Sequence, residues 1–272
     1  MRSSGTPIAW PLRLWLAVEV LFGIAAVMAV GLSPADTATN FAWPIQPVVM
    51  AAVLGGFYIT SAPLFLFPLF ARRWEMIRPM ILPSALFTMI QLAATFLHWD
   101  KFSVGTIPFY VWFASYLLPP PIFVAAYVWH QRKAASGPSE SNDSFPTWLR
   151  NVLVIVGGFL AVGATLIFLF PSLLIPVFPW QLTPLTARSL SGWLLAVGTL
   201  MLAIYFENDQ TRAKLSTPML ILILPVILLQ MLRYADQVDW GNAVLWIGLI
   251  LFAIIGFCGL YLASGSWRKA LS

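Results

Sequence analysis

Residues 151–170 read NVLVIVGGFLAVGATLIFLF, and these twenty positions without a charged residue decide the class of fold. A helix of that length extends about 30 Å at roughly 1.5 Å per residue, which matches the hydrocarbon core of a bilayer. Arg150 directly precedes the stretch and Pro171 directly follows it. The stretch therefore predicts a transmembrane helix.

Seven other apolar stretches of similar length occupy most of the remaining chain. Together they predict eight transmembrane helices, near residues 11–32, 47–70, 79–98, 107–130, 148–170, 186–206, 217–234 and 240–263. Sixty per cent of the 272 residues are apolar and nine per cent are charged, which is too few charges to cover a soluble protein of this size. We therefore expect an all-α integral membrane protein, with membrane lipids as its surroundings.

Basic residues are distributed unequally between the two sides of the membrane. If the amino terminus is cytoplasmic, twelve of the 15 Lys and Arg residues fall on cytoplasmic segments, and Lys101, Arg188 and Arg233 fall outside. This bias follows the positive-inside rule and predicts that both termini are cytoplasmic. The basic residues form no continuous face, so the net charge of +5 does not indicate a nucleic-acid partner.

An internal repeat divides the chain into two units. Shifting the sequence by 137 positions gives 10 identities in 44 over positions 12–55. The matched pairs include Pro34 with Pro171, Trp43 with Trp180, and Gly55 with Gly192. An even number of helices in each unit predicts two tandem copies in parallel orientation. The expected organisation is a four-helix unit over 1–133, a cytoplasmic linker over 134–147 and a second four-helix unit over 148–272.

The stretch PWQLTPLTAR, residues 179–188, contains an unusually placed cation. Thr183 and Pro184 are typical of a helix start, as N-cap and first helical residue. Arg188 would then lie in the first turn, where the helix dipole disfavours a positive charge. A carboxylate such as Asp236, a lipid phosphate or an anionic ligand would compensate this charge, and the sequence leaves these alternatives open.

His98 and Arg233 are expected at equivalent outer ends of the third and seventh helices. A basic residue at the carboxyl end of a helix suits the helix dipole, which is a sufficient structural explanation. Together with Arg188, Tyr234 and Asp236, they also form a candidate rim for an outward-facing polar pocket. That pocket would bind a small anionic or amphipathic ligand.

Two further features lie inside apolar stretches. Glu19 is a carboxylate within the first predicted helix, where an ionised group is costly unless it is paired, hydrated or protonated. It fits either a proton or cation relay or a hydrogen-bonded structural acid. Pro119, Pro120 and Pro121 should break or kink the fourth helix, and such breaks either pack against neighbours or build binding sites.

The run PWQLTPLTAR, followed by Gly192-Trp193, Glu207-Asn208-Asp209 and Arg233-Tyr234, resembles a family of bacterial multi-pass membrane proteins of unassigned function. The resemblance covers most of the second unit and extends weakly to the first through the repeat. It implies the bacterial inner membrane and no particular activity.

The sequence contains no motif that names a reaction. The chain has a single cysteine, Cys258, so it cannot form an intrachain disulfide. Its two histidines, His98 and His130, do not form a metal or haem ligand set. No catalytic residue, metal or cofactor is therefore predicted. The favoured function is binding or transport of a small amphipathic or anionic ligand between the two units. The alternatives are a lipid-active enzyme or accessory subunit, and a structural or assembly partner of an unidentified membrane protein.

Overall fold

The computed structural model of the protein describes residues 5–134 and 144–271, with 265–271 as backbone only. Eight helices among them are long and apolar enough to cross a membrane, as the sequence predicts. They span Trp10–Leu32, Val48–Phe70, Arg78–Leu97, Ile107–Lys133, Thr147–Leu169, Pro184–Glu207, Gln210–Leu232 and Ala243–Ser264. Within the predicted linker, residues 135–143 lie outside the described part of the chain.

The first four spans contain several joined elements. They are α1 (Trp10–Ala26) with the π-helix η1 (Val27–Leu32), α3 (Val48–Ser61) with α4 (Pro63–Leu66) and η3 (Phe67–Phe70), α5 (Arg78–Leu97), α6 (Ile107–Leu117) and α7 (Pro119–Lys133), with the short α2 (Thr37–Asn40) between the first two spans. The chain bends at Leu118, directly before the three prolines. Leu118 keeps helical dihedral angles, φ −80° and ψ −40°, so α6 and α7 form a kinked helix rather than an unwound one.

The last four spans are more regular. They are α8 (Thr147–Leu169), α9 (Pro184–Glu207), α11 (Thr217–Leu232) with the preceding α10 (Gln210–Ala213) and η8 (Lys214–Ser216), and α12 (Ala243–Leu271). The predicted start of α9 is confirmed, because Thr183 Oγ1 accepts from the Thr186 backbone N–H at 3.2 Å and Pro184 is the first helical residue. The Thr183 backbone N–H in turn donates to Thr186 Oγ1 at 2.9 Å, which completes a capping box.

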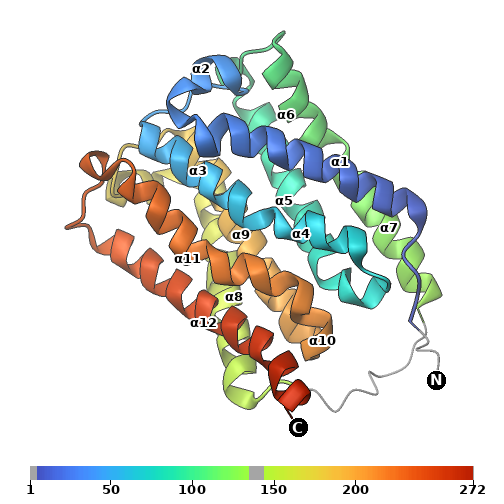
Figure 1. Cartoon of the computed structure of the whole chain (residues 1–272). Coiled ribbons are helices and arrows are strands. Elements are labelled where there is room, and N and C mark those ends of the chain that lie inside the picture. The colour runs from blue at the N-terminus through green and yellow to red at the C-terminus, as the bar shows by residue number, and fades with distance from the viewer. Residues whose placement is uncertain (1–4, 135–143, 272) are drawn as a thin grey trace.

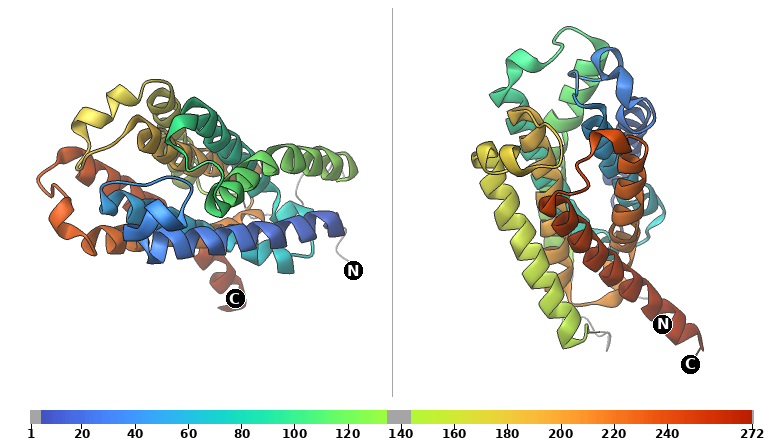
Figure 2. Two further views of the ribbon diagram at one scale, coloured as in Figure 1. Left: turned by 90° about the horizontal axis from the view of Figure 1, so that it is seen from above. Right: turned by 90° about the vertical axis from the view of Figure 1, so that its left-hand side faces the viewer.

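Four of the eight spans are central, because they are more deeply buried than the other four; Figures 1 and 2 show the bundle from three sides. The central helices are α3, α5, α9 and α11, in which 44–72% of the most apolar segment is buried, against 22–28% in the spans of α1, α6–α7, α8 and α12. Helix α3 packs on α11, and α5 packs on α9, so the first and last four spans meet along two helix pairs. Figure 1 shows α2 at one end of the bundle and α10 at the other, here called the α2 end and the α10 end.

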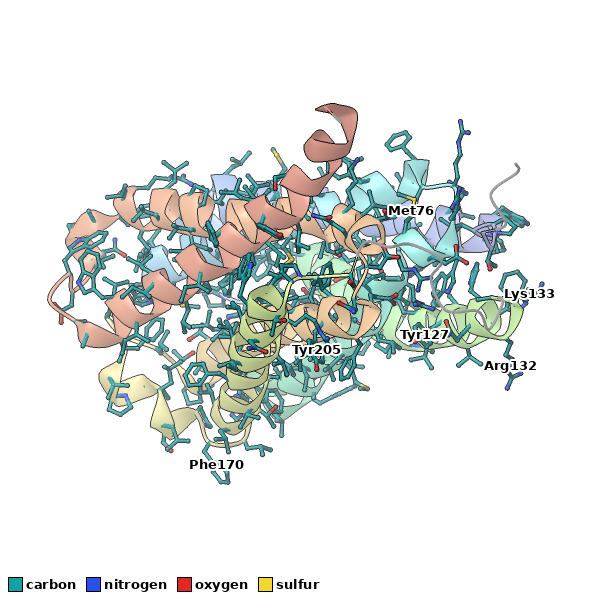
Figure 3. All side chains as sticks on the ribbon, turned by 90° about the horizontal axis from the view of Figure 1, so that it is seen from below. Met76, Tyr127, Arg132, Lys133, Phe170 and Tyr205 are labelled. Carbon is teal, nitrogen blue, oxygen red and sulfur yellow. The ribbon has the colours of Figure 1, made fainter. Side chains whose placement is uncertain are left out.

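The outer surface of the bundle is apolar. Large side chains more than half exposed lie on the surrounding helices, among them Leu21, Ile155, Phe159, Ile250 and Phe257. Charged side chains gather instead at the helix ends; in Figure 3, Arg132 and Lys133 extend away from the body of the molecule at the end of α7. An apolar belt bounded by charged ends matches the solvent that a bilayer provides.

Candidate ligand-binding site

Arg188 lies at the α2 end, beside the end of α8. Its Nε donates to the Phe168 carbonyl oxygen at 3.0 Å, and its guanidinium lies 6.0 Å from the centroid of the Phe168 ring. The last carbonyl groups of a helix have no partner within the helix, so Arg188 caps α8. Its Nη1 is 2.6 Å from His98 Nε2. The structure thus brings together Arg188 and His98. Arg188 donates to two uncharged acceptors, and no ion pair among the described residues includes it.

The His98–Arg188 contact makes the α2 end sensitive to pH. Arg188 can donate only to a neutral imidazole, and burial together with the Arg188 charge lowers the pKa of His98. His98 therefore binds a proton more readily in the unfolded chain than in the folded one. The stabilising contribution of the His98–Arg188 contact is fully present above the ordinary histidine pKa of about 6.5 and decreases as the pH falls below that value. After discounting for solvent screening, we expect a loss of less than about 1 kcal/mol.

Thermal unfolding in detergent between pH 8 and pH 5 measures this effect. The control is His98→Asn, whose side-chain oxygen can accept the same hydrogen bond but does not titrate. We expect the difference in stability between wild type and the variant to change below about pH 6.5. A constant difference over the whole range would show that the His98–Arg188 contact contributes no pH dependence.

Arg233 caps the first helix of the chain. The π-helix η1 directs carbonyl groups away from the usual intrahelical pattern. Arg233 Nη1 donates to Gly31 O and to Gln230 Oε1, both at 2.6 Å, and Nη2 donates to Leu32 O at 3.3 Å. Arg233 is therefore held by partners within the protein, as Arg188 is.

The five residues of the expected outer pocket are divided between these two caps. The Arg233 guanidinium lies 5.6 Å from the centroid of the Tyr234 ring. Asp236 follows in the short 3-10 helix η9 (Ala235–Gln237). In the same turn Gln237 Oε1 accepts from the Val49 backbone N–H at 3.0 Å. His98, Arg188, Arg233, Tyr234 and Asp236 line none of the cavities described below.

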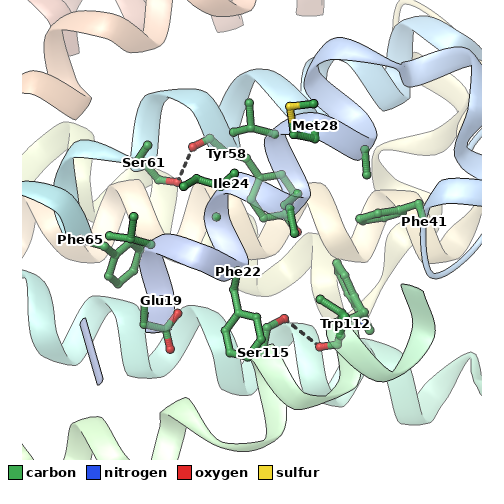
Figure 4. Close-up of a pocket in the computed structure, with 18 of the residues that line it drawn as sticks. Glu19, Phe22, Ile24, Met28, Phe41, Tyr58, Ser61, Phe65, Trp112 and Ser115 are labelled. Carbon is green, nitrogen blue, oxygen red and sulfur yellow. Dashed lines mark hydrogen bonds between the residues drawn. The ribbon is translucent and has the colours of Figure 1, made fainter. Parts of the chain in front are cut away.

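A cavity of about 550 Å³ lies among α1, α3, α5 and α6 (Figure 4). Its walls are apolar and rich in aromatic rings: Phe22, Phe41, Tyr58, Phe65, Phe87, Trp112, Tyr116 and Trp193. Trp193 comes from α9, so the last four spans also contribute to this wall. Volume and lining are typical of a site for a small molecule with a large apolar part.

Glu19 is the acidic residue of the cavity lining. Its residue exposure is 6%, and its Oε1 has no hydrogen-bond partner among the described residues. A buried carboxyl oxygen without a partner is rare, because burial removes the water that would otherwise solvate it. Two uncharged lining groups share this property, Asn40 Oδ1 and the Trp193 indole N–H.

The hydroxyl groups around Glu19 already have partners. Tyr58 and Tyr116 share a hydrogen bond between their hydroxyl oxygens at 2.6 Å, which joins α3 to α6. Ser61 donates to the Tyr58 carbonyl at 3.0 Å, and Ser115 donates to the Trp112 carbonyl at 2.8 Å (Figure 4). None of these hydroxyl groups donates to Glu19. The Trp15 indole, one helical turn earlier on α1, lies next to the carboxyl, and Glu19 Oε1 is left without a donor and available to a ligand.

The cavity opens on the apolar outer surface between α1 and α6. The lining includes Ile24 of α1, Met28 of η1 and Ile107 of α6, which are 54%, 56% and 79% exposed. These residues therefore face both the cavity and the surroundings of the bundle. This opening lies toward the α2 end of the bundle, because Met28 belongs to η1 and Ile107 is the first residue of α6.

Comparison with known proteins adds no relative. No family model, curated protein or solved structure matches the chain. The function is therefore inferred from the cavity itself, and the resemblance of residues 179–188 to a bacterial family stays a prediction.

Sequence reasoning identified Glu19 but missed the cavity around it. The signal for Glu19 is its isolation, since a carboxylate inside an apolar stretch always requires an explanation. The aromatic walls give no such signal, because Tyr58 and Tyr116 lie 58 residues apart and membrane helices contain many aromatic residues. The spacing of Trp112 and Tyr116, four residues apart on α6, places both on one helix face and is the one local indication available.

Proposed function

We propose that this protein is a multi-pass protein of the bacterial inner membrane that binds an amphipathic ligand in the cavity between α1 and α6. The observation that carries the proposal is the buried Glu19 carboxyl, whose Oε1 has no hydrogen-bond partner, in an aromatic cavity that opens on the apolar surface. The apolar part of the ligand would contact the aromatic walls, and its polar part would meet Glu19. Exchange with the bilayer would occur sideways, between α1 and α6.

A ligand path between the two sets of four spans has less support. The region where α3 meets α9 is filled by large side chains, with the rings of Phe57 and Trp193 stacked at 5.5 Å between centroids. A cavity of about 30 Å³ beside Ser61 and Ser84 has room for little more than one water molecule. We therefore place the ligand within the first four spans, and we propose binding and lateral exchange rather than passage through the centre.

We also propose that the two sets of spans are repeats with both termini cytoplasmic. A second cavity, of about 250 Å³, lies among α8, α9, α11 and α12. At the 137-residue shift, lining residues of the two cavities coincide: Phe22 with Phe159, Val27 with Ala164, and Phe41 with Phe178. The buried Glu19 corresponds to the buried Val156, so a carboxyl distinguishes the first cavity from the second.

Filling the cavity should remove the ligand without disturbing the fold. A Cβ atom added to Gly23 would meet nothing within 4 Å, and Gly23 lines the cavity. The Gly23→Phe variant is therefore expected to fold and to lose most of a small molecule that co-purifies with the wild type. Native mass spectrometry of protein purified in mild detergent measures the bound species.

Gly158→Phe is the matched control. A Cβ at Gly158 also meets nothing within 4 Å, but Gly158 lies on α8 and does not line the cavity. We expect it to keep the bound species at the wild-type level. Equal occupancy in Gly23→Phe and Gly158→Phe would contradict the proposed site.

A further inference from the structure

We infer that the ligand is an organic cation, such as a hydrophobic amine or a quaternary ammonium or phosphonium ion, whose charge lies beside Glu19. This inference rests on the proposed function and specifies the chemical class of its ligand. Two independent features of the cavity support it: an uncompensated carboxyl and a surrounding set of aromatic rings.

The first feature is the absence of a protein cation beside Glu19. Among the described residues, no ion pair includes Glu19. The arginine on the same helix, Arg13, donates instead to the backbone carbonyls of Leu69 and Ala71, at 2.6 and 2.5 Å. A carboxyl in an apolar environment must be protonated, hydrated or paired with a cation. A cationic ligand supplies the missing partner.

The second feature is the aromatic lining. The faces of aromatic rings carry negative potential and attract a cation within about 6 Å of the ring centroid. Phe22 of α1 and Tyr58 and Phe65 of the α3–α4 segment line the cavity together with Glu19 (Figure 4). Tyr116 of α6 also lines it. Tyr58 and Tyr116 are also the other titratable residues of the lining, and each hydroxyl has the other as its partner.

An anionic ligand fits this cavity poorly. Its charge would lie next to the Glu19 carboxyl, with no cationic side chain in the lining to attract it. The arginines that the sequence offered for an anion, Arg188 and Arg233, lie outside the cavity and donate to backbone carbonyls. An anionic ligand is therefore not expected in this cavity.

Binding of radiolabelled tetraphenylphosphonium to the protein in nanodiscs tests this inference, with triphenylphosphine oxide as a neutral aromatic competitor of similar chemistry. In the wild type we expect saturable binding of the cation. In Glu19→Gln, loss of the buried charge partner should weaken cation binding at least about tenfold and leave the affinity for the neutral compound unchanged. Retained binding of the neutral compound also shows that the variant is folded.

Asp100→Asn is the matched control, because it also converts a carboxylate to an amide but lies on the exposed surface at the α2 end, away from the cavity. It should bind the cation like the wild type. Equal cation affinity in wild type and Glu19→Gln would overturn the inference about charge, and the proposed function would survive if Gly23→Phe still loses its ligand. If neither compound binds and Gly23→Phe has no effect, both proposals fail.

Discussion

Replacing Gly55 with leucine is expected to prevent the protein from forming a stable bundle. A Cβ atom at Gly55 would overlap the backbone of Val30 and Gly31. Backbone atoms cannot rotate out of the way as a side chain can, so η1 would have to leave α3 and would lose the Arg233 cap on Gly31. The expected loss in the free energy of unfolding exceeds about 4 kcal/mol, which few single substitutions reach.

The stability of Gly55→Leu can be compared with that of Gly248→Leu by thermal unfolding in detergent, followed by size-exclusion chromatography. A Cβ at Gly248 meets nothing within 4 Å, so this second variant introduces the same side chain into a helix without overlap. We expect a folded peak for Gly248→Leu and an aggregated or absent peak for Gly55→Leu. A wild-type melting temperature for Gly55→Leu would show that the first helix does not pack on α3 as described.

The second large effect is expected for Glu207→Gln at the α10 end. Glu207, at the end of α9, forms a two-point ion pair with Arg78 at the start of α5, and it also accepts from Arg212 Nη1 at 3.1 Å. Its side chain is 9% exposed. The amide would leave Arg78 without its paired carboxylate at a contact between the first and last four spans, whereas Arg212 keeps Asp209 at 3.6 Å. We expect a loss of about 2–4 kcal/mol, close to that for breaking a buried pair.

Asp100→Asn again provides the comparison. The Asp100–Lys101 pair is 2.8 Å long, but its side chains are 71% and 64% exposed. Exposed pairs contribute between about 0 and 1 kcal/mol, so this variant should unfold close to the wild type in the same assay. Similar small losses in both variants would mean that the Arg78–Glu207 pair does not hold the two halves together.

The eight helices could be predicted from sequence because a bilayer imposes the length of an apolar stretch. The seventh helix shows that an apolar stretch can be shorter than the helix that contains it. Its apolar part begins at 217 and matches α11, but the span starts at Gln210, through the short α10 that contains Arg212. Asp209 starts α10 by accepting from the backbone N–H groups of Thr211 and Arg212. Helix capping by a polar residue therefore extends the helical segment beyond its apolar part.

The roles of the two outer arginines could not be predicted in the same way. Their charges are visible in the sequence, but their partners include the backbone carbonyls of Phe168, 20 residues before Arg188, and of Gly31, 202 residues before Arg233. A carbonyl has the same chemistry at every residue, and only the π-helix and the end of α8 make these two available. The cavity is hidden for a related reason, since the sequence does not say that α1 lies against α6.

The most direct test of a ligand between α1 and α6 is photo-crosslinking from inside the cavity. The photoreactive amino acid p-benzoylphenylalanine can replace Phe22, which lines the cavity, or Phe257, which is 61% exposed on α12. After irradiation of living cells, intact-protein mass spectrometry reports the mass added at each position. We predict one discrete adduct at Phe22, lost in combination with Gly23→Phe, and a broad mixture of membrane lipids at Phe257. The same lipid mixture at both positions would contradict a selective binding site.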